Sequence, residues 1–163
     1  MTARIVPLLP RHVRGFHAAL DSVAREGRFL AMIEAPPLAA ARRFVRNGTA
    51  AGSVQFVALV DEVVVGWCDI SRLAWNARSH SGTLGMGVIA PQRGRGVGRA
   101  LLDATLARAD EAGLTRVELR VRIDNVPAIR LYERSGFEVE GTCRRYLQQE
   151  GAFHDALIMA RLR

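Results

Sequence analysis

The sequence feature that most constrains the fold is the stretch from Met86 to Gly98, M-G-V-I-A-P-Q-R-G-R-G-V-G. An apolar segment typical of a strand runs into a turn with three alternating glycines, and the segment from Arg99 to Ala112 then has the pattern of a helix. The first turn of a helix leaves backbone N–H groups unpaired, and the helix dipole adds partial positive charge there. This order of strand, turn and helix predicts an anion site that fits a phosphate group.

Two sets of residues in this turn suit a phosphate ligand. Glycines lack a Cβ, so the main chain can approach a bulky polyanion closely and can adopt positive φ. They are Gly94, Gly96 and Gly98. Arginines add guanidinium groups that form forked hydrogen bonds with phosphate oxygens. They are Arg93, Arg95 and Arg99.

Two common phosphate-binding motifs do not explain the turn. A Walker A loop needs a lysine followed by Ser or Thr after its last glycine, and all 23 basic residues of this chain are arginine. The segment Gly85-x-Gly87-x-x-Ala90 matches a dinucleotide fingerprint but leads into Pro91, so no helix opens on its glycines. The turn therefore predicts a different kind of phosphate ligand.

A second segment, from Asn125 to Phe137 (N-V-P-A-I-R-L-Y-E-R-S-G-F), lies one strand and turn after the predicted helix. Together with R-x-x-G-x-G at Arg93, Gly96 and Gly98, it resembles the two recurring signatures of the GNAT superfamily of N-acetyltransferases. The resemblance extends from about Val54 to the C-terminus and is looser before that residue. Two signatures at the expected separation are more specific than either alone.

The hydrophobic pattern predicts two leading helices followed by elements in the order ββ, β, helix, β, helix, ββ. The predicted helices run from Pro10 to Glu26, Leu38 to Arg46 and Arg99 to Ala112, with a short one after Asn125. The predicted strands run from Arg4 to Leu8, Val54 to Val60, Val63 to Ser71, His80 to Ile89, Thr115 to Ile123, Phe137 to Gln149 and Ala152 to Leu162. This order suits an α/β (α+β) fold with a single mixed, mostly antiparallel sheet flanked by helices, in one domain over residues 1–163.

The resemblance implies acetyl-CoA as the acetyl donor, with its pyrophosphate held by the Gly-rich turn. The residues of the turn are Arg93, Gly94, Arg95, Gly96, Val97, Gly98 and Arg99. It also implies that backbone N–H groups near Met86 and Val88 hold the thioester oxygen, and that Asn125 contacts the pantetheine arm. Asn125 equally suits the N-cap of a helix that has Pro127 in its first turn.

Tyr132 is the candidate proton donor. The resemblance implies that its hydroxyl protonates the sulfur of CoA, and phenol chemistry permits this. The alternative is that Tyr132, three residues after Ile129, is a core aromatic residue of an amphipathic helix.

The acceptor amine must lose a proton before it attacks, and the sequence offers two candidate bases besides water. His80 has an unperturbed pKa near ~6.5 and heads the strand that leads to the turn. Glu34 lies between the first two predicted helices, a region that usually borders the acceptor pocket in proteins of this family. Each residue also has a plain interpretation, as a structural or exposed histidine and as a solvated loop carboxylate.

The resemblance implies an N-acetyltransferase that moves the acetyl group directly to a primary amine of a small molecule, free amino acids included. Acetylation of protein N-termini and a non-catalytic acyl-CoA-binding module are the alternatives. The histidines and cysteines lack the spacing of zinc ligands, so we predict no metal. Cys68 and Cys143 are expected to be reduced structural thiols.

The net charge of +7 would suit a nucleic-acid partner, but the arginines are scattered, so nucleic-acid binding is not expected. No apolar run approaches a membrane span and the N-terminus lacks the pattern of a signal peptide. We therefore expect a cytoplasmic protein without membrane contact. A homodimer through a sheet edge or through the last two strands is compatible with the sequence.

Overall fold

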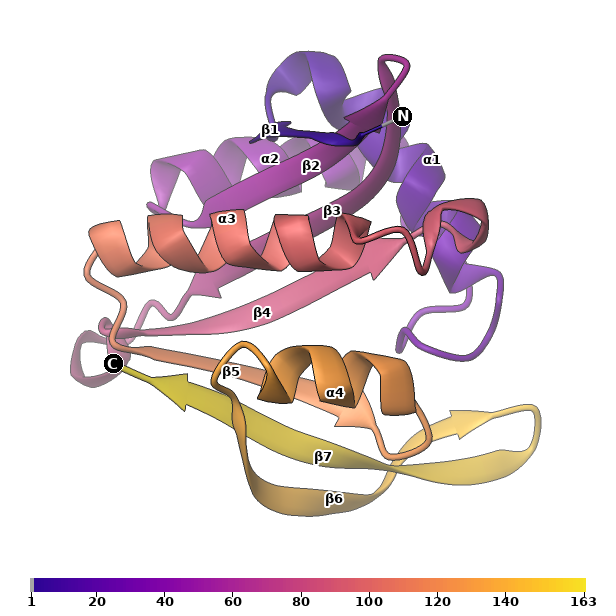
Figure 1. Cartoon of the computed structure of the whole chain (residues 1–163), viewed down its shortest axis with the longest axis vertical. Coiled ribbons are helices and arrows are strands. Elements are labelled where there is room, and N and C mark those ends of the chain that lie inside the picture. Colours follow the sequence, from indigo (N-terminus) through magenta and orange to yellow (C-terminus); the bar gives the residue numbers. More distant parts are fainter. Residues whose placement is uncertain (1) are drawn as a thin grey trace.

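The computed structural model describes residues 2–163, which form one seven-stranded sheet in the order β1-β2-β3-β4-β5-β7-β6 (Figure 1). Only β4 and β5 pair in parallel within this part of the chain. The strands are β1 (Arg4–Pro7), β2 (Val54–Val60), β3 (Val63–Arg72), β4 (Ser81–Val88), β5 (Arg116–Arg122), β6 (Glu138–Gln149) and β7 (Ala152–Leu162). The predicted mixed, mostly antiparallel sheet is confirmed.

Four α-helices of the described chain cover the sheet, two on each face. They are α1 (Val13–Ala24), α2 (Leu38–Ala50), α3 (Val97–Glu111) and α4 (Val126–Glu133). Figure 1 shows α3 and α4 in front of the sheet and α1 and α2 behind it. Each face has its own apolar core, one around α1 and α2 and the other around α3 and α4. Residues of β3 enter both cores, because side chains alternate between the faces of a strand.

The element boundaries differ from the predicted ones by a few residues at most places. The largest difference is in α2, which continues to Ala50, four residues beyond Arg46. Gly48 is tolerated there because the side chain of Gln55 occupies the place of a Cβ, with Nε2 only 2.4 Å from it. The turn between β2 and β3 places both Asp61 and Glu62 at positive φ, 49° and 63°. This conformation is that of a tight hairpin turn, achieved here without glycine.

The strands β4 and β5 pair over a short length and then diverge (Figure 1). Their register covers only Ser81–Thr83 of β4 and Arg116–Glu118 of β5. The second half of β4 therefore borders a gap in the sheet, close to the point where the chain enters the Gly-rich turn. This gap lies between the two helical layers, and it positions the candidate site.

Candidate active site

The Gly-rich turn has the geometry of an anion site. Gly94 and Gly96 have φ of 72° and 82°, in the left-handed region that favours glycine. Gly96 is the N-cap of α3, and in the described chain no side chain caps this end and no acidic residue lies in its first turn. A Cβ at Gly94 or Gly96 would meet no described atom within 4 Å, so the backbone is open to a ligand. The first N–H groups of α3 are thus available to a pyrophosphate.

The arginines of the turn are less free than the sequence indicates. Arg93 donates to both carboxylate oxygens of Glu26, with 2.8 Å between Nη1 and Oε2, and its Nε donates to the Val88 carbonyl oxygen at 2.8 Å. Its guanidinium also lies 5.3 Å from the ring centroid of Phe29. Arg99 pairs with Asp103 one turn further along α3. Arg93 therefore ties the turn to the segment after α1, and its contact with phosphate stays a prediction.

The open edge of β4 supplies backbone donors to the gap. The N–H of Ile89 bonds to the Val65 carbonyl oxygen on β3, at 3.0 Å. Because the bonding direction of an antiparallel strand alternates from residue to residue, the N–H groups of Met86 and Val88 point away from β3. They face the gap between β4 and β5, as their predicted contact with a thioester oxygen requires.

The helix α4 brings Asn125 and Tyr132 to the other border of the gap. The Oδ1 of Asn125 accepts from the Ala128 N–H at 3.4 Å, so the predicted cap is present. Tyr132 is buried, and its ring centroid lies 5.7 Å from that of Phe137. Burial, with a smaller contribution from nearby Cys68, raises the pKa of the Tyr132 hydroxyl. A phenol that stays protonated is suited to donate a proton, so the core position and the predicted acid role are compatible.

A cavity of about 280 Å³ lies on the opposite face, under α1 and α2. Its walls are largely apolar and include Phe16, Leu20, Leu30, Met32, Phe44 and Trp67. Trp67 lies across Gly87 of β4, where a Cβ would come within 2.3 Å of the indole Cη2. Glycine is therefore required at this position by the packing of the indole, which gives the second glycine of the apparent dinucleotide fingerprint a structural cause.

The segment between α1 and α2 forms one wall of this cavity and is held at several points. The Leu30 carbonyl oxygen accepts from Nε2 of Gln149 at 2.8 Å, which anchors the segment to the end of β6. Asp21 accepts from the Ala35 N–H at 2.9 Å, which anchors it to α1. These bonds fix the wall that carries Leu30 and Met32 without placing charge in the cavity.

Asp69 on β3 is the one acidic residue that lines this cavity in the described chain. It pairs in register with Gly85 on β4, and an ideal Cβ at Gly85 would lie 3.4 Å from the Asp69 Oδ1. Burial raises the pKa of Asp69 to about 7, and a long hydrogen bond from Ser71 Oγ, at 3.5 Å, opposes the shift. Sequence reasoning missed this residue. The available signal was a single carboxylate within the apolar run V-V-V-G-W-C-D-I.

Neither candidate base from the sequence lies at this cavity. His80 is exposed just before β4, and its carbonyl oxygen accepts from the N–H groups of Thr115 and Arg116 at the paired end of β4 and β5. Gly85 is five positions further along the extended chain, a distance of roughly 17 Å. Glu34 is exposed and lies 3.5 Å from Arg25. His80 thus lies at the far end of β4 from Gly85, and Glu34 is not among the residues that line the cavity, although Met32 and Pro36 on either side of it are.

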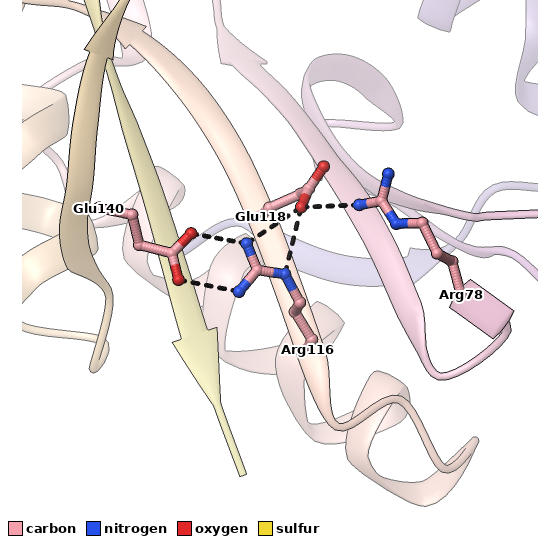
Figure 2. Close-up of polar contacts among 4 residues, drawn as sticks. All are labelled: Arg78, Arg116, Glu118 and Glu140. Atoms are coloured by element: carbon pink, nitrogen blue, oxygen red, sulfur yellow. Dashed lines mark hydrogen bonds and ion pairs between the residues drawn. The ribbon is translucent and has the colours of Figure 1, made fainter.

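An ion-pair network joins β5 to Arg78 in the loop before β4 (Figure 2). Arg116 bonds to Glu140 at 2.8 Å and to Glu118 at 3.2 Å, and Arg78 bonds to Glu118 at 3.0 Å. These carboxylates raise the pKa of the Arg116 guanidinium. The two arginines and two glutamates balance in charge, so the network joins the loop before β4 to β5 and β6 and leaves no net charge for a ligand.

Residues 2–163 contain no group of three His, Cys, Asp or Glu side chains that could hold a metal ion. The parts that do converge are an uncapped helix N-terminus, an open strand edge, a buried tyrosine and a cavity with one acid. These are the parts expected of an enzyme that binds a phosphate-bearing donor on one side of a split sheet and an acceptor on the other.

Comparison with known proteins agrees with this class. The chain belongs to the acetyltransferase (GNAT) family, whose model matches residues 17–137. It is similar to the L-amino acid N-acetyltransferase AaaT of Escherichia coli strain K12, with 38% identity over 113 residues, 69% of this chain and 70% of the relative. It is also 40% identical over 98 residues to the N-alpha-acetyltransferase RimI of Mycobacterium tuberculosis, 60% of this chain and 59% of that protein. The protein is therefore an N-acetyltransferase.

A solved structure gives the same fold over almost the whole chain. The phosphinothricin acetyltransferase of Sinorhizobium meliloti, determined in complex with acetyl-CoA, superposes with a TM-score of 0.93 at 21% identity. The match covers 99% of this chain and 89% of that one. In the described part of the chain, none of the helices has the length and hydrophobicity to cross a membrane.

Proposed function

We propose that this protein transfers the acetyl group of acetyl-CoA directly to a primary amine of a small molecule whose remaining part is apolar, with a free amino acid as the leading candidate. The observation that supports this most directly is the apolar cavity with one carboxylate, opposite the gap in the sheet. Its volume of about 280 Å³ lies just below the range of about 300–1,000 Å³ typical of pockets for drug-sized ligands, so it suits a smaller one.

Acetyl-CoA is the donor, and it supplies an acetyl group activated as a thioester. The turn from Arg93 to Arg99 holds its pyrophosphate through the backbone N–H groups that lead into α3. The backbone N–H groups of Met86 and Val88 donate to the thioester oxygen and stabilise the charge that develops on it. Asn125, beyond its capping bond, borders the pantetheine arm.

Tyr132 donates a proton to the departing sulfur. Its burial against Phe137 keeps the ring in one place, and the raised pKa of its hydroxyl keeps the proton on oxygen until a thiolate is present. With donor and acceptor held on opposite faces of the same gap, transfer needs no acyl-enzyme. Cys68 is fully buried and its pKa is raised by that burial, which makes it a poor nucleophile.

The test combines calorimetric binding of acetyl-CoA with release of free thiol against a panel of amino acids, polyamines and peptides with free N-termini. We expect apolar amino acids to be acetylated in preference to peptides. Tyr132→Phe should bind acetyl-CoA within about twofold of the wild type while kcat falls roughly 100-fold or more. Tyr146→Phe is the matched control, because Tyr146 is 43% exposed on β6.

Three outcomes would contradict parts of this proposal. Preference for peptides over free amino acids would favour an N-terminal acetyltransferase, the activity named for RimI of M. tuberculosis. Binding of acetyl-CoA without turnover of any amine would favour a non-catalytic module. Undiminished kcat in Tyr132→Phe would remove the tyrosine from the mechanism.

A further inference from the structure

Resting on the proposed acceptor cavity, we propose that Asp69 is the catalytic base: its carboxylate binds the ammonium group of the acceptor and takes a proton from it. The role is assigned by position. Asp69 is the acid at the end of the apolar cavity that meets β4, beside the gap where the proposed function places the donor's thioester.

The register of β3 and β4 places this carboxylate next to the reacting centre. Asp69 pairs with Gly85, and the following pair is Cys68 with Met86, whose N–H points into the gap. Since Gly85 has no side chain, its position on β4 leaves the carboxylate uncovered, and Oδ1 lies 3.4 Å from where a Cβ would be. An amine held by Asp69 is therefore one residue along β4 from the proposed donor of the thioester oxygen's hydrogen bond.

The surroundings of Asp69 leave its charge uncompensated. On β2 its register partner is Gln55, whose amide donates to the Phe44 carbonyl oxygen, and on β3 the neighbour is Ser71. The helices α1 and α2 present apolar residues to the cavity. On β5, Glu118 is held by arginines of the network already described. Within residues 2–163, then, no cation pairs with Asp69, and a bound ammonium group would supply one.

The same surroundings make Asp69 a stronger base than an ordinary carboxylate. Its pKa of about 7 lies close to neutral pH, where a general base combines adequate ionisation with adequate basicity. The shift is caused by desolvation, which disfavours the charged form. The carboxylate therefore ionises as the pH rises through about 7, and catalysis should rise with it.

The proton balance closes. The ammonium nitrogen gives one proton to Asp69, and the neutral amine then forms the N–C bond while the C–S bond breaks. Tyr132 protonates the sulfur, and the second proton lost by nitrogen restores the phenol. The products are the amide and free CoA thiol, and Asp69 returns its proton to solvent, so each turnover releases one net proton.

The experiment measures kcat/KM from pH 5.5 to 10 for the wild type, Asp69→Asn and the control Glu111→Gln, which changes an exposed carboxylate on α3. We expect the wild-type profile to fall on the acid side with a midpoint at about pH 7. Asp69→Asn should lose roughly 100-fold or more at pH 7.5. Its profile should lack the fall in kcat/KM with a midpoint at about pH 7. Part of the lost kcat/KM should return above pH 9, where more of the acceptor is present as the free amine.

Two further measurements keep the result interpretable. Acetyl-CoA affinity should stay within about twofold of the wild type in Asp69→Asn, and its Tm at pH 8 should equal or exceed that of the wild type. The reason is that the folded state raises the pKa of Asp69 from 3.8 to about 7, so stability is lost as the pH rises from about 4 to about 7, and the isosteric amide removes that cost. Asp69→Ala provides a second variant if the amide perturbs the cavity.

The assignment of the base to Asp69 would be overturned if Asp69→Asn kept kcat/KM within threefold of the wild type, or kept the fall in kcat/KM below pH 7. In both cases the wild type would still acetylate an amine. Failure of the proposed function looks different, because the wild type itself would then release no thiol with any amine of the panel. A loss in Asp69→Asn that is equal at every pH would also overturn the role as base.

Discussion

Gly96 offers the sharpest test of the anion site, because its replacement by alanine separates backbone strain from ligand binding. A Cβ at Gly96 meets no described atom within 4 Å, so the folded-state cost is that of placing alanine at φ 82°. That strain is about 1–2 kcal/mol. Alanine regains about 0.4–1 kcal/mol because its unfolded chain is less free. The free energy of unfolding should therefore fall by ~1 kcal/mol, which lowers Tm by about 2–4 °C for a chain of this size.

Acetyl-CoA affinity should fall by far more than this strain explains. The methyl group would point into the open space before α3, where the pyrophosphate is expected, and would displace at least one charge-assisted hydrogen bond. Such a bond is worth about 1.5–3 kcal/mol. At about 1.4 kcal/mol per factor of ten, the dissociation constant should rise roughly 10- to 150-fold in calorimetry.

Gly113 provides the matched control at the other end of the same helix. It has φ 76°, and a Cβ placed there would also meet no described atom within 4 Å, so Gly113→Ala should lose similar stability. Its acetyl-CoA affinity should remain within about twofold of the wild type. Equal affinities for the two variants would refute the assignment of the phosphate site to the turn at Gly96.

Two predictions concern contacts that support the site. The side chains of the Arg93–Glu26 ion pair are 36% and 25% exposed. A double-mutant cycle of Arg93→Ala and Glu26→Gln should therefore give a coupling free energy of about 1 kcal/mol in urea unfolding. Additive effects of the two substitutions would show that this ion pair does not stabilise the fold. Gly87→Ala should cost about 1–3 kcal/mol and change tryptophan emission, because the new methyl would overlap the ring of Trp67. Gly85→Ala, whose nearest described atom is 3.4 Å away, should cost less; a larger loss there would show that the indole does not decide the packing.

Much of the fold could be predicted from local sequence signals. The strand from Arg116 to Arg122 alternates apolar and charged residues, and the Gly-rich turn lies between an apolar segment and a helix. Asn125 and Pro127 mark a helix start by capping chemistry alone. These features depend on residues close in sequence, which is why a single amino-acid sequence is enough to predict them.

The candidate site was harder to predict because its acceptor side depends on which strands meet. His80 heads the strand that enters the Gly-rich turn, and sequence adjacency made it a plausible base. An extended strand, however, carries its two ends far apart. Asp69 lies in a different strand and reaches the site only through its register with Gly85. Arg93 suited a phosphate by charge, but its pairing with Glu26 spans 67 positions and left no local signal.

The register between β3 and β4 also determines which side of the sheet each part of the site faces. Cys68 and Asp69 are consecutive, so they face opposite sides of the sheet: Cys68 lies near Tyr132, and Asp69 faces the acceptor cavity. A slip of one residue would exchange these faces. Two glycines of β4 oppose such a slip, because each leaves room for a large side chain on a neighbouring strand. A Cβ at Gly82 would come within 2.4 Å of Ile70 on one face, and one at Gly87 would overlap the indole on the other, so a slip that brought a residue with a side chain to either place would cause a clash. The glycines of β4 therefore lock the register that separates the proposed acid from the proposed base.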